Sequence, residues 1–213
     1  TYASGANCGV SAPVILQGAV VQGTAESLGG LVIGTLKNPN ARFVFGSNSA
    51  AADMRTAWVS YGNPTWHITT GMYASIGDYL NLPSWGTGGA TDSMRVDAQS
   101  GAESNEGILM AVMYGTSMVH DAGFFNFGYA YDAKYLIFID GLVQRARHHE
   151  KSWTCTDENL CIDVIDHVAR HPEEGGYIMS RHTADHFMEN LYIPPRFMNN
   201  SKIDSGSTLA LGN

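Results

Sequence analysis

The strongest constraint on the fold is a regular alternation of short β-rich runs with longer helical patterns. Four runs have strand character, at residues 13–17, 42–46, 82–86 and 117–122. A helical pattern follows each of them, at about residues 24–37, 63–81, 97–114 and 131–148. Repeats of this kind form parallel sheets, because a helix is the usual crossover between parallel strands. We therefore expect an α/β fold with four parallel strand–helix units.

Several helix boundaries follow from residue types. Thr24 is expected to cap the first helix, which Asn38-Pro39 would end. Asn63 and Pro64 suit the N-cap and first-turn positions of the second helix. Beyond residue 150 the alternation stops, and we expect Thr156 to cap a helix that reaches about residue 170, with a short helix near residues 183–191.

Two architectures fit four such units: an open doubly wound sheet and part of a (β/α)8 TIM barrel. The sequence contains neither Gly-x-Gly-x-x-Gly after the first strand nor a Walker loop, which removes the best support for a nucleotide-binding open sheet. A complete barrel needs about 250 residues and eight strands. We expect residues 1–150 to form the C-terminal half of a barrel, and residues 151–213 to form a helical extension with a polar tail.

Composition excludes several classes of protein. The hydrophobic fraction of 44% and the charged fraction of 15% exclude intrinsic disorder. A net charge of −8, with no basic cluster, argues against binding to nucleic acid or to an anionic membrane surface. No apolar run is long enough to span a bilayer, and three cysteines do not indicate a disulfide framework or a zinc site. We expect a soluble, cytoplasmic protein.

Functional residues of such folds lie in the loops after the carboxyl ends of strands. That criterion selects Gln17, Asn48, the loop of residues 88–93, and the segment from His120 to Tyr129. The two glycines of the loop 88–93 let the backbone approach a ligand closely, and a turn in which Asp92 caps a backbone amide is an equal alternative. A phosphate cradle is less favoured there, since Asp92 would repel the anion and Arg95 is the nearest cation in the sequence.

Aromatic residues gather in the segment that follows His120. Phe127 and Tyr129 are two of four aromatic residues between positions 124 and 129. Such clusters are ordinarily core residues. The alternative is an aromatic pocket for an alkylated ammonium ion, which is attracted to the face of an aromatic ring.

Histidines at two places have spacings that metal ligands also show. His148 and His149 are better explained as cations at a helix C-terminus, and His182 and His186 lack the glutamate of a zincin helix. We predict no metal site. No Gly-x-Ser-x-Gly motif indicates a nucleophile, and no residue is assigned a covalent catalytic role.

Several short motifs occur in an order that is typical of one family. They are Arg42–Gly46, Gly88-Gly89-Ala90-Thr91-Asp92-Ser93, Asp97–Gly101, Ile162–Ile165, and Gly175-Gly176-Tyr177 with His182-Thr183 and His186-Phe187. Together they resemble the trimethylamine–corrinoid methyltransferase (MttB) family, and the resemblance covers most of the chain. It implies a (β/α)8 barrel of nearly twice this length, of which this chain is the C-terminal half.

The resemblance also implies a reaction and a set of partners. The family transfers a methyl group from a methylated amine to the Co(I) centre of a separate corrinoid protein, so no cofactor is bound directly and the cobalamin-type corrinoid is carried by the partner. The trimethylamine enzymes have pyrrolysine just before the Thr-Asp-Ser motif, where this chain has Gly89 and Ala90. The sequence resembles the branch without pyrrolysine, which demethylates quaternary amines such as glycine betaine.

On this basis the expected substrate-binding residues are Gln17, Asn48, Asp92, His120, Phe127 and Tyr129. Asp92 would offset the substrate cation, His120 would bond a substrate carboxylate, and the aromatic residues would line the methylammonium pocket. Two other functions stay open: a phosphate-binding barrel lyase or isomerase, supported by the glycine-rich loop, and a non-catalytic module that binds quaternary amines. Whether the chain forms a homo-oligomer is also open.

Overall fold

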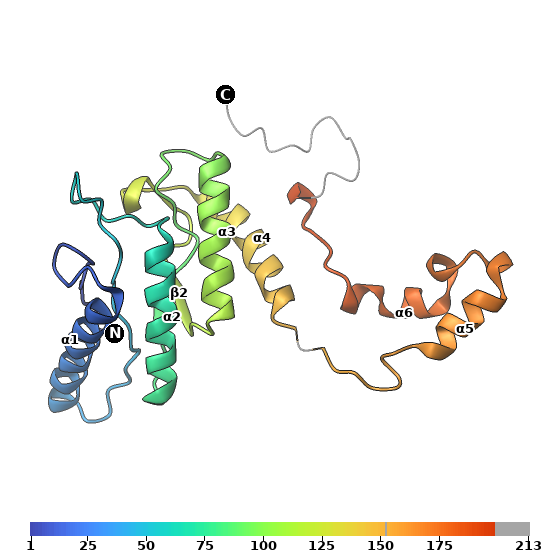
Figure 1. Cartoon of the computed structure of the whole chain (residues 1–213), viewed down its shortest axis with the longest axis horizontal. Helices are drawn as coiled ribbons and strands as arrows, with labels where there is room; N and C mark the ends of the chain where they lie inside the picture. The colour runs from blue at the N-terminus through green and yellow to red at the C-terminus, as the bar shows by residue number, and fades with distance from the viewer. Residues whose placement is uncertain (152, 199–213) are drawn as a thin grey trace.

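The computed structural model describes residues 1–151 and 153–198, which form a mixed α/β structure (Figure 1). Four helices make up the body of the molecule: α1 (Leu16–Lys37), α2 (Pro64–Tyr79), α3 (Ala98–Met113) and α4 (Ala133–His149). Consecutive helices pack against one another, α1 on α2, α2 on α3, and α3 on α4. Each helix after α1 occupies a region in which the sequence predicted one, and α1 extends its predicted region toward the N-terminus.

Short parallel strands cross the body beside these helices. β1 (Trp85–Thr87) pairs in parallel with β2 (Met118–His120), with Trp85 opposite Met118 and Thr87 opposite His120. These strands lie at the predicted runs 82–86 and 117–122. The run 42–46 contributes a single parallel bridge, from Phe45 to Ser84, on the other side of β1. Three chain segments therefore run side by side in one direction, while residues 1–151 and 153–198 contain no closed barrel.

The first predicted strand, at residues 13–17, is wrong. Helix α1 begins at Leu16, and Val14 and Ile15 lie exposed just before it. A short apolar run suits a strand or a helix equally well, and a helix satisfies its backbone hydrogen bonds without a neighbouring strand. Thr24 consequently lies inside α1, and Ile15 occupies the N-cap position without a side-chain hydrogen bond.

The next helix starts are set by local hydrogen bonds. The Asn63 side chain accepts a hydrogen bond from the Thr65 N–H, and Pro64 is the first residue of α2, as predicted. At α3 the Asp97 carboxylate accepts the Ser100 N–H, while the Ser100 hydroxyl accepts the Asp97 N–H. This reciprocal pair is a capping box, which satisfies two otherwise unpaired amides. Its stabilising effect exceeds the destabilising effect of the two glycines in the region predicted for α3.

The aromatic segment after β2 is a hairpin and not an open loop. β3 (Phe124–Phe125) pairs antiparallel with β4 (Ala130–Tyr131), and the 3-10 turn η1 (Asn126–Gly128) joins them. Phe125 points into the core, where it stacks on Tyr135 with ring centroids 4.3 Å apart. Phe127 sits at the tip with a left-handed φ of 57°. The hairpin therefore separates core aromatic residues from exposed ones.

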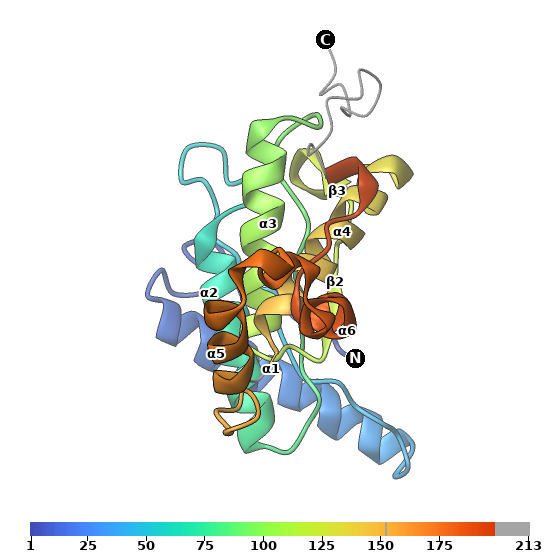
Figure 2. The same cartoon turned by 90° about the vertical axis from the view of Figure 1, so that its right-hand side faces the viewer.

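The C-terminal part leaves the body as an arm (Figure 1). It contains α5 (Ile162–Arg170), α6 (Arg181–Asn190) and the 3-10 turns η2 (Pro172–Glu174), η3 (Tyr177–Met179) and η4 (Arg196–Met198). In the perpendicular view α5 and α6 lie in front of the body, so the two views agree (Figure 2). Thr156 does not cap α5, which begins six residues later.

The chain returns from the arm to α4, where Phe197 and Met198 approach Gly141 closely. The predicted polar tail from residue 199 lies outside the described residues. Among the helices of residues 1–151 and 153–198, none is long and apolar enough to cross a bilayer.

The main core lies between α3, α4 and the hairpin. Its buried residues are Ile108, Phe125, Tyr135, Ile139, Leu142 and Ala146. Tyr135 also hydrogen-bonds the Ser104 hydroxyl (2.7 Å) and donates to the Ser100 carbonyl (2.8 Å). This core fixes the hairpin to the helices that flank the parallel strands.

Replacing Ile139 tests that core. Ile139 is 1% exposed, whereas Ile137 on the same helix is 61% exposed. We expect Ile139→Ala to lower the free energy of unfolding of the 213-residue chain by about 2–5 kcal/mol, because a large-to-small change leaves a cavity. Ile137→Ala should change it by about 0.5 kcal/mol or less. Urea denaturation of both variants measures this difference, and equal losses would contradict the packing described.

A buried histidine makes the stability depend on pH. His67 on α2 is 3% exposed, with Nδ1 3.9 Å from Glu106 Oε1. Burial lowers the pKa of His67 below its ordinary value of 6.5, and the nearby carboxylate of Glu106 opposes this only in part. The folded chain therefore keeps a neutral imidazole at a pH where the unfolded chain is already protonated.

Stability should fall as pH drops below about 6.5, because the unfolded state then binds a proton that the folded state does not. The loss should stop once the pH reaches the lowered pKa of His67. Denaturation curves recorded between about pH 7.5 and 5 should be flatter for His67→Gln than for the parent. The exposed His149 provides the control, since His149→Gln should retain the parent's slope.

Candidate functional site

Two cavities lie near the carboxyl ends of the parallel strands. The first has a volume of about 320 Å³ and is lined by Thr1, Ala3, Asn48, Trp85, Met118, Val119 and His120. Two of the residues predicted from the sequence, Asn48 and His120, thus share one cavity. Trp85 was not predicted from the sequence, because the prediction covered the loops that follow strands and Trp85 lies within a strand.

Three buried polar atoms of this first cavity lack a hydrogen-bond partner within the described structure. They are Asn48 Oδ1, Trp85 Nε1 and His120 Nε2. Buried polar groups are usually paired, since leaving one unpaired costs about 1–3 kcal/mol. All three side chains line this one cavity, and the unpaired atoms themselves are enclosed by protein.

The His120 ring is oriented from its other side. His120 Nδ1 lies 2.5 Å from Asp121 Oδ2, and the Thr87 hydroxyl donates to the same carboxylate oxygen over 3.3 Å. The ring also lies against Trp85, with centroids 5.1 Å apart. Strand pairing places Thr87 opposite His120, so the sheet itself builds this chain of contacts. Nδ1 is engaged by the carboxylate, and Nε2 is buried without a hydrogen-bond partner in the described structure.

The second cavity is aromatic and has a volume of about 590 Å³. Trp58, Tyr61, Phe127 and Tyr129 contribute its rings. The Trp58 ring lies 5.4 Å from both the Phe127 and the Tyr129 rings, and it meets Phe127 edge-on. Phe127 and Tyr129, both selected from the sequence, therefore line one cavity. Trp58 and Tyr61 were missed, although they lie in the same strand-end loop as Asn48.

Asp92 holds the loop that carries Tyr61. One carboxylate oxygen accepts the Tyr61 N–H over 2.6 Å, and the other accepts a short hydrogen bond from the Ser60 hydroxyl. Burial raises the pKa of the Asp92 carboxyl above its ordinary value, and these two hydrogen bonds oppose the rise. Because both oxygens are engaged within the protein, Asp92 positions the wall of the aromatic cavity.

Two carboxylates lie close enough to this cavity to act on the Tyr61 hydroxyl. Burial raises the pKa of Tyr61, and the negative charges of Asp121 and Asp92 raise it further. Asp121 is the same residue that binds His120, so it lies within electrostatic reach of both cavities. An aromatic cavity close to two acids favours a cation over an anion.

The glycine-rich loop is committed to contacts inside the protein. The Gly88 N–H donates to the His120 carbonyl and the Thr91 N–H to the Phe124 carbonyl. The Asp92 N–H and the Thr91 hydroxyl both donate to the Glu103 carboxylate, at 2.9 and 2.5 Å. Amides in these bonds are not available to a phosphate, and Glu103 would repel one. The loop geometry argues against the phosphate-cradle alternative.

Gly89 and Ala90 are buried within this loop. Gly89 has a φ of +80°, and a Cβ built on it would lie 2.9 Å from Ile139 Cγ2. An ordinary side chain is therefore strained and crowded at position 89. The packing is consistent with the small residues Gly89 and Ala90, in place of a large side chain, before Thr91.

Gln17 is not brought to these cavities. It lies exposed in the first turn of α1 and lines neither of them. Its selection depended on the strand at residues 13–17, which the structure replaces with the start of α1.

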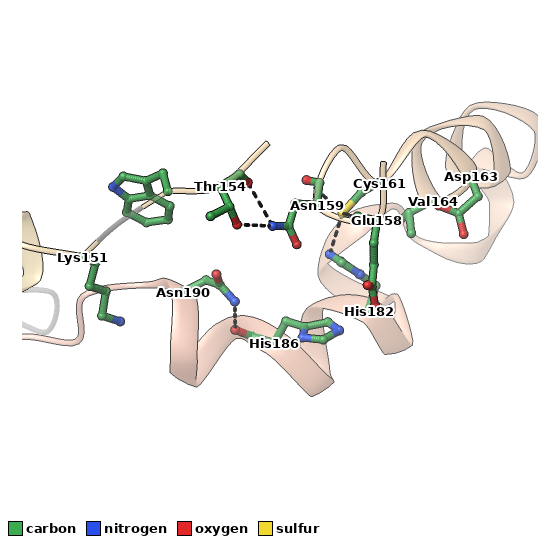
Figure 3. Close-up of a pocket in the computed structure, with 11 residues that line it drawn as sticks. Lys151, Thr154, Glu158, Asn159, Cys161, Asp163, Val164, His182, His186 and Asn190 are labelled. Carbon is green, nitrogen blue, oxygen red and sulfur yellow. Dashed lines mark hydrogen bonds between the residues drawn. The ribbon is translucent and has the colours of Figure 1, made fainter. Parts of the chain in front are cut away.

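A separate cavity of about 600 Å³ lies in the arm, between α6 and the segment that precedes α5 (Figure 3). His182 reaches Cys161 there, with 3.8 Å between Nε2 and Sγ, and its ring lies 4.8 Å from that of His186. The Asn159 amide nitrogen binds the Thr154 carbonyl over 2.9 Å. The contact between His182 and Cys161 joins α6 to the segment before α5.

Comparison with known proteins gives consistent relatives. A family model described as trimethylamine methyltransferase (MTTB) matches residues 3–205. The chain is 30% identical over 187 residues to glycine betaine methyltransferase of Desulfitobacterium hafniense strain Y51, covering 87% of this chain and 38% of that protein. It is 28% identical over 178 residues to trimethylamine methyltransferase MttB of D. hafniense strain DCB-2, covering 84% and 35%.

A third relative comes from another genus. Trimethylamine methyltransferase MttB of Methanosarcina barkeri strain Fusaro is 26% identical over 160 residues, which cover 75% of this chain and 32% of that protein. The chain thus spans about a third of the length of the curated relatives it matches. Because the family model extends over nearly the whole chain, the chain belongs to the trimethylamine methyltransferase (MTTB) family.

Proposed function

We propose that the protein carrying this chain transfers a methyl group from a quaternary amine to the Co(I) centre of a separate corrinoid protein. The observation that carries the proposal is the aromatic cavity of Trp58, Tyr61, Phe127 and Tyr129, close to the carboxylates of Asp92 and Asp121. A quaternary ammonium ion is held by aromatic faces and by nearby negative charge. Family membership supports the reaction class.

We also propose that residues 1–150 are the C-terminal half of a (β/α)8 barrel and that residues 151–213 are an extension to it. The parallel order of Phe45, β1 and β2 supports this, because neighbouring barrel strands follow one another in sequence. Exposed apolar residues on α1 also support it. Val21, Ile33 and Leu36 are 70%, 68% and 81% exposed. Such a surface is typical of one that other protein segments cover.

The proposed reaction needs no acid or base catalysis from these residues. A quaternary nitrogen leaves as a neutral amine, so it needs no proton when its methyl group departs. The corrinoid supplies the nucleophile when the partner is bound. The residues of this chain then bind the ammonium group, orient one methyl group and exclude water.

A carboxylate on the substrate would suit the first cavity. Trp85 Nε1–H is a donor in every protonation state, and His120 Nε2 donates when the imidazole is protonated. Both atoms are buried without a partner. Glycine betaine, with an ammonium and a carboxylate group, is the substrate class that this pair of cavities favours.

A non-catalytic module that binds quaternary amines is the second candidate. It is supported by the absence of an assigned nucleophile among the cavity residues. A methyl-transfer assay with the cognate corrinoid protein distinguishes the two: methylated cobalt confirms the enzyme, whereas betaine binding without transfer favours the module.

Substitution of Phe127 tests the ammonium pocket. Phe127→Ala should weaken glycine betaine binding by about 2- to 30-fold, from a cation–π contribution of about 0.5–2 kcal/mol. Binding of the uncharged-headgroup isostere 3,3-dimethylbutanoate should weaken less, because its tert-butyl group has no charge for the ring to attract. Calorimetric titration of both ligands measures the difference.

Phe124→Ala is the matched control, since Phe124 packs on Tyr131 and lines neither cavity. It should leave the preference for betaine over the isostere unchanged. Equal losses for the two ligands in Phe127→Ala would mean that Phe127 only packs.

The Trp85 donor has a separate test. Trp85→Phe keeps the ring system's apolar character and removes Nε1–H, so binding of glycine betaine should weaken by about 10- to 150-fold, the range for a hydrogen bond to a charged group. Tetramethylammonium has no carboxylate and should bind as in the parent. Trp153→Phe, at a side chain that is 68% exposed, is the control. A similar loss for both ligands would assign Trp85 a packing role only.

A further inference from the structure

Two histidines on the arm face the same side of α5. His167 and His171 are four residues apart, at the end of the helix, and their ring centroids lie 4.8 Å apart. Residues at this spacing lie one above the other on a helix face. Two imidazoles at helical i, i+4 spacing are a recurring element of zinc sites. This pair is not among the histidines that were singled out from the sequence, His148 with His149 and His182 with His186.

The turn after α5 brings two carboxylates back to these rings. Pro172 starts η2, and Gly175, with a φ of +89°, ends it. Glu174 Oε2 lies 2.9 Å from His167 Nε2, and Glu173 Oε1 lies 3.3 Å from His171 Nδ1. Ligand atoms of His171, Glu173 and Glu174 all lie within 4.8 Å of one another.

These separations are close to those of a metal site. Zinc binds imidazole nitrogen and carboxylate oxygen at about 2.0–2.2 Å, so tetrahedral ligand atoms lie about 3.3 Å apart. We propose that His167, His171, Glu173 and Glu174 form a binding site for a divalent transition-metal ion, with Zn²⁺ as the expected occupant. The mixed nitrogen and oxygen donor set favours zinc over the all-oxygen sites of Mg²⁺ and Ca²⁺.

Two features separate this cluster from ordinary surface ion pairs. Ligand atoms of His171, Glu173 and Glu174 lie within 4.8 Å of one another and His167 on α5 contacts Glu174, whereas a surface ion pair joins two side chains. A cavity of about 500 Å³, lined by His167, His171 and Glu174 among others, adjoins the cluster and gives an ion access from solvent. The metal would clamp η2 onto the last turn of α5. This site is independent of the function proposed above.

The other i, i+4 histidine pair provides an internal comparison. His182 and His186 have the same ring separation of 4.8 Å, but their polar neighbour is Cys161 Sγ, 3.8 Å from His182 (Figure 3). Within residues 1–151 and 153–198, only the cluster of His171, Glu173 and Glu174 has three ligand atoms close enough for one ion.

The test is titration of untagged, chelator-treated protein with ZnCl₂ by calorimetry. We expect one Zn²⁺ per chain, and His167→Ala and His171→Ala should each weaken binding by at least about tenfold, the lower bound known for outer-shell changes. Glu174→Gln should weaken it as well. Co²⁺ as a spectroscopic substitute should give the visible absorption of four-coordinate cobalt in the parent, and His171→Ala should lose it.

Controls place the ion within the arm. His149→Ala and His182→Ala should bind Zn²⁺ like the parent. Because the four proposed ligands are partly or fully exposed, their replacement should leave the helical circular dichroism unchanged. The proposal is overturned if the parent binds no Zn²⁺, if His167→Ala and His171→Ala bind it unchanged, or if only His182→Ala loses it.

Discussion

Parallel pairing between the segment at Phe45, β1 and β2 is the constraint on which the site depends. The carboxyl ends of parallel strands meet at one edge, so the loops that follow them are brought together. Thr87 and His120 are opposite one another in this pairing, and the Asp121 carboxylate joins them through hydrogen bonds. Without the parallel register, Thr87 and His120 would not share the Asp121 carboxylate.

A buried polar network extends this arrangement to the aromatic cavity. Glu103 on α3 holds Thr91 and the Asp92 amide, and Asp92 in turn holds Ser60 and the Tyr61 amide. Carboxylates are costly to bury unless they are well hydrogen-bonded. The network therefore stabilises one loop arrangement, in which Tyr61 lines the cavity. The Thr-Asp-Ser motif therefore shapes the aromatic cavity indirectly, through the position of that loop.

Local sequence signals predicted a large share of the fold. Asn63-Pro64 and Asp97 mark helix starts that the structure confirms, because a cap depends on atoms only two or three residues apart. The run 82–86 overlaps β1 and the run 117–122 contains β2, since both combine apolar residues with flanking turn residues. The run 13–17 failed because its choice between strand and helix depends on a distant pairing partner.

The site residues also fall into those that local sequence predicts and those that depend on tertiary contacts. The sequence by itself determined the family, the aromatic segment with Phe127 and Tyr129, and the place of His120 at the end of a strand. Only the tertiary structure decided that Trp58 and Tyr61 complete the aromatic cavity, that Trp85 Nε1 is buried without a partner in the described structure, and that Gln17 lies elsewhere. The physical reason is that these roles depend on contacts between segments tens of residues apart, which chain pattern alone does not specify.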